Sequence, residues 1–129
     1  MLEGYEQPDE MPSINVDEQG IVHADFGTIP ITAAHIVYCV QKQKEISDLG
    51  RWPVMLTGEV AHNIDGDVSR IGSTPWVADA TSALAIITEK KITRILANFF
   101  MKIQKNPYPT KLFDSREEAY EWLKKFTTE

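Results

Sequence analysis

Residues 93–123 read TRILANFFMKIQKNPYPTKLFDSREEAYEWL and contain the local signals that decide the fold. Apolar residues recur at helical spacing across residues 91–104 and predict an amphipathic helix. The following NPYP turn ends that helix, because proline lacks the backbone N–H that a helix interior needs. Residues 111–113 then predict a short strand, and Ser115 with Glu118 form the S-x-x-E capping box of a last helix. A helix, a strand and a capped helix in succession indicate an α/β domain.

The N-terminal third predicts a hairpin followed by a helix. Residues 13–16 and 21–26 alternate as strands do, and DEQG between them supplies turn residues, so we expect an antiparallel hairpin at the sheet edge. An apolar stripe predicts a helix over 32–48. Thr32 is suited to cap its N-terminus. Residues 1–12 are acidic and poor in apolar side chains, and we expect a flexible arm there.

The middle of the chain predicts two buried strands with short helices between them. Residues 53–57 and 83–88 are continuous apolar runs, as in central parallel strands. One short helix is expected to start near Asp67 and another at Thr74, where a proline follows at the first helical position. The element order β-β-α-β-α-β-α-β-α therefore predicts a single α/β domain over 13–127. We expect a mainly parallel sheet with an N-terminal antiparallel edge hairpin and helices packed on it.

Composition and charge exclude several classes of partner. The chain of 129 residues is 43% hydrophobic and carries a net charge of −6, with a sequence pI near 5.0. Nucleic acids and anionic membranes bind clustered Lys and Arg, so neither is expected as a main partner. No signal peptide and no apolar run long enough to span a bilayer is visible, which favours a soluble, cytoplasmic protein. The single cysteine, Cys39, sits in a helical apolar pattern, and we expect a buried, inert thiol.

No motif for catalysis, cofactors or metals is present. The three histidines lack metal-ligand spacing, and neither a phosphate-binding glycine loop nor a nucleophile elbow occurs. The N-x-D-x-D run at 63–67 resembles the start of a calcium loop, but Val68 stands where that loop needs glycine. We therefore expect a non-enzymatic protein without a cofactor.

One basic helix face is a candidate binding site. Residues 90–111 contain six Lys and Arg side chains and no acid. Helical spacing places one set of these polar residues on a single face. This set comprises Lys91, Arg94, Asn98 and Lys102. Arg94 and the helix N-terminus could hold an anion, so one hypothesis is a phosphorylated ligand or an acidic partner. The alternative is a solvated face opposite the apolar stripe.

The segments RWPVML, TRILANFF, PYPTKLF and EAYEWL, in this order of elements, resemble small bacterial proteins of unknown function with a STAS-like fold. STAS stands for sulphate transporter and anti-sigma-factor antagonist. The resemblance covers about residues 13–126 and implies a protein-binding switch. In the anti-sigma-factor antagonists, a kinase phosphorylates a serine in an Asp-Ser-Ser-Gly-type motif after the third strand. Here Asp65 lies near the motif's Asp, but Gly66 occupies the serine position, and Ser69 follows three residues later.

The preferred functional hypothesis is a regulatory module that binds another protein, or itself, without catalysis. The expected surface is the loop after the third strand with the neighbouring helix starts, where α/β sheets usually bind ligands. Its candidate residues are His62, Asp65, Asp67, Ser69 and Arg70. Ser69 is either a phosphorylation site or a solvent-facing helix residue. Two alternatives remain: a binder of an anionic ligand through the Arg94 face, and a homodimer in which the edge hairpins pair.

Overall fold

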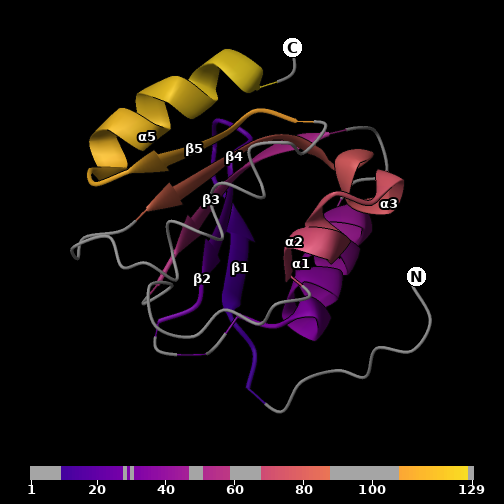
Figure 1. Cartoon of the computed structure of the whole chain (residues 1–129). Helices are drawn as coiled ribbons and strands as arrows, with labels where there is room; N and C mark the ends of the chain where they lie inside the picture. The colour runs from indigo at the N-terminus through magenta and orange to yellow at the C-terminus, as the bar shows by residue number, and fades with distance from the viewer. Residues whose placement is uncertain are drawn as a thin grey trace.

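The protein is an α/β domain built on a five-stranded mixed sheet (Figure 1). The structure, a computed structural model, describes residues 10–27, 29, 31–46, 51–58, 68–87 and 108–127. The strand order follows the sequence, β1-β2-β3-β4-β5. Within the described ranges no helix is both long and apolar enough to cross a bilayer.

The predicted hairpin is confirmed. Strand β1 (Ser13–Val16) pairs with β2 (Val22–Asp25) in antiparallel register, with Val16 facing Val22. The turn closes with a hydrogen bond from the Gly20 amide to the Asp17 carbonyl at 3.1 Å. Gly20 adopts a φ of 86°, in the left-handed region where glycine avoids a Cβ clash. The turn therefore follows from local sequence.

The remaining strands are parallel, as the alternation of strands and helices predicts. Strand β3 (Trp52–Thr57) pairs with β2 and with β4 (Thr81–Ile87), and β5 (Thr110–Phe113) forms the far edge beside β4. Strands β3 and β4 are buried over most of their length. A parallel strand covered on both faces needs apolar side chains in succession, which explains why continuous apolar runs predict these two strands.

In the described part of the chain, three helices precede β4. Helix α1 (Ala33–Ile46) begins after Thr32, whose Oγ1 accepts a hydrogen bond from the His35 amide at 3.3 Å. The two short predicted helices are α2 (Val68–Gly72) and α3 (Pro75–Ala78). Proline occupies the first position of α3, where its missing N–H costs no helical hydrogen bond.

The last helix is confirmed together with its cap. Helix α5 (Arg116–Leu123) starts after Ser115, whose side chain accepts a hydrogen bond from the Glu118 amide at 3.3 Å. A short 3₁₀ helix, η1 (Lys124–Phe126), extends it. The predicted helix over 91–104 lies outside the described residues, as does most of the N-terminal arm.

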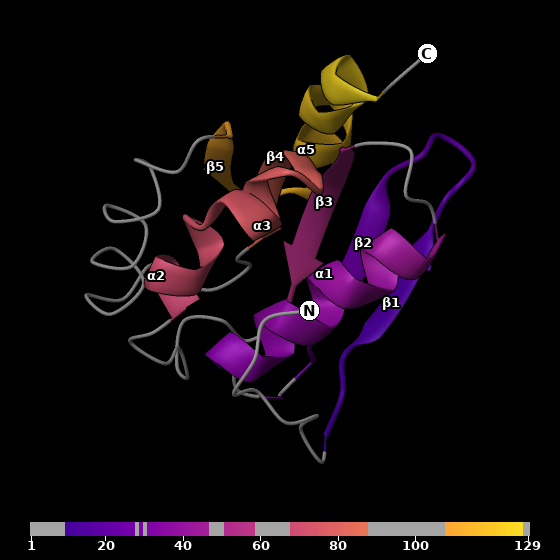
Figure 2. The same ribbon diagram turned by 90° about the vertical axis from the view of Figure 1, so that its right-hand side faces the viewer.

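The helices form a layer on each side of the sheet. Helices α1, α2 and α3 lie on one side, and α5 lies on the other (Figures 1 and 2). On the first side a buried cluster joins Cys39 of α1 to Val22, Val54 and Ile86 of the strands. On the second side Ala119 and Leu123 of α5 pack on a cluster that includes Met55. The sheet therefore separates two hydrophobic cores and contributes side chains to both.

Candidate functional site

The candidate surface lies where α2 meets the carboxyl ends of the parallel strands. Val68, the first residue of α2, is buried in the same cluster as Phe26, Leu56 and Ile86. These three residues stand at or beside the last positions of β2, β3 and β4. In open α/β sheets this is the end at which ligands and partners bind. Helix α2 therefore begins at the expected edge of the sheet.

Helix α2 is held firmly at its C-terminal end. The Arg70 carbonyl accepts hydrogen bonds from the Ser73 amide at 3.3 Å and the Ser73 hydroxyl at 2.9 Å. The Thr74 amide and hydroxyl donate to the Ile71 carbonyl at 3.1 and 2.8 Å. The last carbonyls of a helix have no partner within the helix. The bonds from Ser73 and Thr74 satisfy two of these carbonyls and thereby anchor the C-terminal end of α2.

Tyr108 supplies the remaining anchor, from a distant part of the chain. Its hydroxyl donates to the Gly72 carbonyl at 2.7 Å, and the residue is 6% exposed. From the sequence, Tyr108 beside its prolines either covers an edge of the core, which is the favoured interpretation, or is partly exposed and available to a partner. The structure agrees with the first, because the ring packs with Ile71 and Val77 while its hydroxyl bonds the buried Gly72 carbonyl. Burying a carbonyl without a partner is costly, so the tyrosine stabilises α2.

Only two of the sequence-predicted site residues fall within the described ranges. Ser69 is the second residue of α2, and Arg70 follows it as an exposed helical residue. The loop residues and the basic-face residues lie outside the described part of the chain. These are His62, Asp65, Asp67, Lys91, Arg94, Asn98 and Lys102. The structure therefore brings together Ser69 and Arg70 and leaves the anion-binding hypothesis untested.

His35 has a structural role. It is 5% exposed, and its Nε2 lies 2.8 Å from the carbonyl oxygen of Glu10. Its Nδ1 lies 3.3 Å from the Thr32 amide and 2.8 Å from the Thr32 hydroxyl. Two donors directed at Nδ1 leave Nε2 to carry the proton that bonds Glu10. The histidine thus ties the start of α1 to the segment that enters β1.

His23 pairs with the turn of the hairpin. Its Nε2 lies 2.8 Å from Oδ2 of Asp17, and both side chains are about a quarter exposed. Asp17 Oδ1 also accepts hydrogen bonds from the amides of Gln19 and Ile21, at 2.9 and 3.1 Å. Burial raises the pKa of Asp17, but the hydrogen bond from His23, those from the two amides and the charge of His23 together lower it below its usual value.

This network predicts a pH dependence of stability. A carboxyl whose pKa is lowered by folding stabilises the protein above its unfolded pKa, and that contribution is lost as pH falls through the folded value. We expect the free energy of unfolding to decrease between about pH 5 and about pH 3. Asp17→Asn should reduce that decrease, as measured by urea unfolding, whereas Glu18→Gln should not. Equal pH profiles for wild type and Asp17→Asn would show that this network does not govern stability.

No metal site forms among the described residues, where no three His, Cys, Asp or Glu side chains lie close enough to hold an ion. Cys39 is buried, and burial raises the pKa of its thiol to about 12. The thiol is therefore protonated at neutral pH and is a poor nucleophile, since the thiolate is the reactive form.

Sequence comparison places the chain in a family. A family model described as a domain of unknown function, DUF7793, matches residues 15–127. The chain belongs to this family. One similar solved structure is the crystal structure of a protein with unknown function from Arthrobacter sp. FB24, which is 26% identical. The likeness covers 86% of this chain and 97% of that one, with a TM-score of 0.31. Comparison with curated proteins finds no match.

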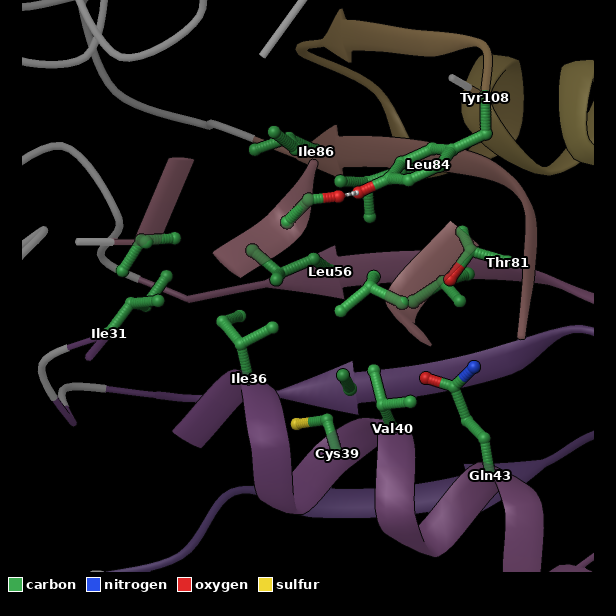
Figure 3. A pocket seen from close by; sticks show the side chains of 15 residues that line it. Ile31, Ile36, Cys39, Val40, Gln43, Leu56, Thr81, Leu84, Ile86 and Tyr108 are labelled. Carbon is green, nitrogen blue, oxygen red and sulfur yellow. Dashed lines mark hydrogen bonds between the residues drawn. The ribbon is translucent and has the colours of Figure 1, made fainter. Parts of the chain in front are cut away.

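A small apolar cavity lies between the sheet and the helices on the α1 side (Figure 3). Its volume is about 70 Å³. Cys39, Val40 and Gln43 of α1 face Leu56 and Ile86 of the sheet across it. Ligand pockets usually enclose several hundred Å³, so this space is too small for a typical metabolite. The buried Gln43 amide donates to the Ala80 carbonyl at 3.1 Å and is thereby committed to the fold.

A more open groove of about 330 Å³ lies on the other side of the sheet, beside α5. It is lined by His23, Met55, Arg116, Glu117, Tyr120 and Glu121. The carboxylates already have partners: Glu117 accepts from the Ser115 hydroxyl at 2.9 Å, and Glu121 lies 3.0 Å from Lys124 Nζ. His23 is bonded to the hairpin turn. Three of the polar side chains that line the groove, Glu117, Glu121 and His23, are therefore already bonded within the fold, and α2 remains the better candidate.

Proposed function

We propose that this chain is a non-enzymatic, STAS-like protein-interaction module that acts in regulation in the cytoplasm. Its binding surface is centred on α2 and includes the candidate residues that precede α2 in the sequence, His62, Asp65 and Asp67. The sequential strand order, with one antiparallel edge pair and the remaining strands parallel, supports the STAS-like resemblance. The observation that carries the proposal is the anchoring of α2 at the carboxyl ends of the strands.

This anchoring has a consequence for binding. The backbone of an anchored helix loses little freedom when a partner docks, so less binding energy is spent on ordering the backbone. Val68 and Ile71 are 4% and 2% exposed, which fixes the inner face of α2 in the core. Arg70 is exposed on the outer face. Arginine is enriched among the residues that dominate protein interfaces, which makes Arg70 the natural anchor of this surface.

The test compares two exposed arginines. Arg70→Glu should abolish capture of the partner from the native lysate, or weaken it by about tenfold or more, because charge reversal at an interface is strongly unfavourable. Arg51 is also exposed but precedes β3, at the opposite end of the strands, so Arg51→Glu is the matched control. Both variants should unfold within about 1 kcal/mol of wild type. A partner that tolerates Arg70→Glu as well as Arg51→Glu would refute this surface.

Phosphate mapping of the same captured protein tests the regulatory part of the proposal. A phosphoryl group on Ser69 would add negative charge within the first turn of α2, beside Arg70. We expect phosphorylated chains to be depleted from the captured complex. Enrichment of phosphorylated chains in the complex would reverse the proposed direction of the switch.

A further inference from the structure

Among the residues that the structure describes, strand β1 presents an open hydrogen-bonding edge. It is the end strand of the sheet (Figure 2). Residues of an antiparallel strand alternate between bonding the neighbouring strand and pointing away from it. The Asp17 amide donates to the Ile21 carbonyl of the facing segment at 3.0 Å. By this alternation the backbone groups of Ile14 and Val16 point outward, where no described residue pairs with them.

The negative charge of the chain is concentrated in its N-terminal sequence, which includes β1. The first 27 residues contain seven Asp and Glu side chains and no Lys or Arg. The rest of the chain, with 12 acids and 13 bases, is nearly neutral. Glu10, Glu18 and Asp25 are exposed in and around the β1–β2 hairpin. The described segment that contains β1, residues 10–27, thus carries four acids and no Lys or Arg.

We propose that the β1 edge binds an extended, Lys- or Arg-rich segment of a partner protein as an additional strand. The backbone groups of Ile14 and Val16 supply hydrogen bonds of the kind that strand addition uses. The surrounding carboxylates select a basic partner through complementary charge. This surface lies at the end of the sheet and is separate from α2, so it extends the proposed function.

The two faces of the edge specify different side chains. Ile14 and Val16 are half-buried and pack on the core of the α1 side. Ser13 and Asn15 face the other way, on the same side as Asp25 and His23, their cross-strand partners. An added strand would place its alternate residues on these two faces. The preferred segment therefore alternates apolar with basic residues.

Charge also decides between a foreign strand and a second copy. Pairing of two β1 edges around a two-fold axis would bring together two described segments, residues 10–27, that each contain four acids and no Lys or Arg. Like charges placed opposite each other across strands are destabilising. The edge therefore repels its own copy and attracts a basic strand.

The experiment uses the full chain and a synthetic peptide of about eight residues in which valine and lysine alternate. Hydrogen exchange measured by NMR should show new protection at the amides of Ile14 and Val16 on addition of the peptide. A peptide with glutamate in place of lysine should produce no protection. Protection at other amides only, or equal binding of the glutamate peptide, would overturn the proposal.

Two variants test separately the contributions of backbone hydrogen bonds and of side-chain charge to peptide binding. Ile14→Pro removes one outward N–H and leaves the bonds to β2, since proline is tolerated at the open side of an edge strand. Ile14→Pro should weaken binding of the lysine peptide by about tenfold. The double variant Glu10→Lys with Glu18→Lys leaves the backbone intact and should weaken binding of the same peptide by a similar factor at low salt. Peptide binding unaffected by both changes would overturn the proposal.

The state of the free protein is a further test. If Ile14 and Val16 amides are protected before the peptide is added, the edge is already occupied, either within the chain or by a second copy. Sedimentation would distinguish these two cases, and either contradicts the proposal. Arg70→Glu should leave peptide binding unchanged, so failure of the α2 surface and failure of the β1 edge are independent results.

Discussion

Gly58→Ala is expected to destabilise the fold by about 3 kcal/mol or more. Gly58 follows β3 with a φ of +138°, a conformation that side chains rarely adopt. A Cβ there would lie 3.0 Å from Phe26 Cβ and 3.1 Å from both N and O of Gly27. These atoms belong to or adjoin the backbone and cannot rotate away. The Phe26 amide also bonds the Thr57 carbonyl at 2.8 Å, which holds the two segments together.

Gly27→Ala is the matched control for this prediction. Gly27 has a φ of 58°, but an added Cβ would meet nothing within 4 Å. Its cost is therefore the left-handed backbone alone, about 1 kcal/mol. Urea unfolding of both variants should separate the two by about 2 kcal/mol. Equal losses would mean that the contact with residues 26–27 yields easily and that backbone conformation alone matters.

Leu123→Ala is expected to destabilise the protein by about 3 to 4 kcal/mol. Leu123 is fully buried beneath α5, in the cluster that covers the second face of the sheet. Truncation removes the contacts of the side chain and leaves a cavity that the surrounding core fills only in part. Urea unfolding measures the loss. Lys125→Ala, exposed two residues later, should change the free energy of unfolding by less than about 0.5 kcal/mol.

The result for Leu123→Ala also shows whether the Ser115 N-cap or the packing of Leu123 keeps α5 helical. The Ser115 cap should keep the helix ordered in the variant, because the cap is local and does not depend on Leu123. We therefore expect lower stability with nearly unchanged far-ultraviolet circular dichroism at low temperature. Loss of helical signal in the native state would show that packing, rather than the cap, keeps this helix ordered.

Several elements of the fold could be predicted because their signals are local. Pro75 starts α3, Ser115 caps α5 and the Asp17–Gly20 turn joins the hairpin, each within a few residues of the element it sets. Continuous apolar runs located β3 and β4 because strands covered on both faces have no polar side to display. The predicted ends of the helices and strands differ from the observed ends by one or two residues, which is the usual uncertainty of such boundaries.

The candidate site was predictable only in position. The carboxyl end of a parallel strand indicates where α/β domains bind, and α2 begins there with Ser69 and Arg70. The anchoring of α2 was not predictable, because Tyr108 is 36 residues from the carbonyl it bonds. An aromatic residue beside prolines is typical of a core edge, but no local pattern indicates a hydrogen-bond partner so distant in the chain.

The sequence by itself determined the order and type of the described elements, the turn chemistry and the acidic character of the N-terminal segment, because these depend on neighbouring residues and on composition. Only the tertiary structure decided that Tyr108 bonds the Gly72 carbonyl, that Gly58 contacts residues 26–27 and that His35 binds the Glu10 carbonyl. Each of these depends on contacts between segments distant in the sequence, which form only when the chain closes around its two cores.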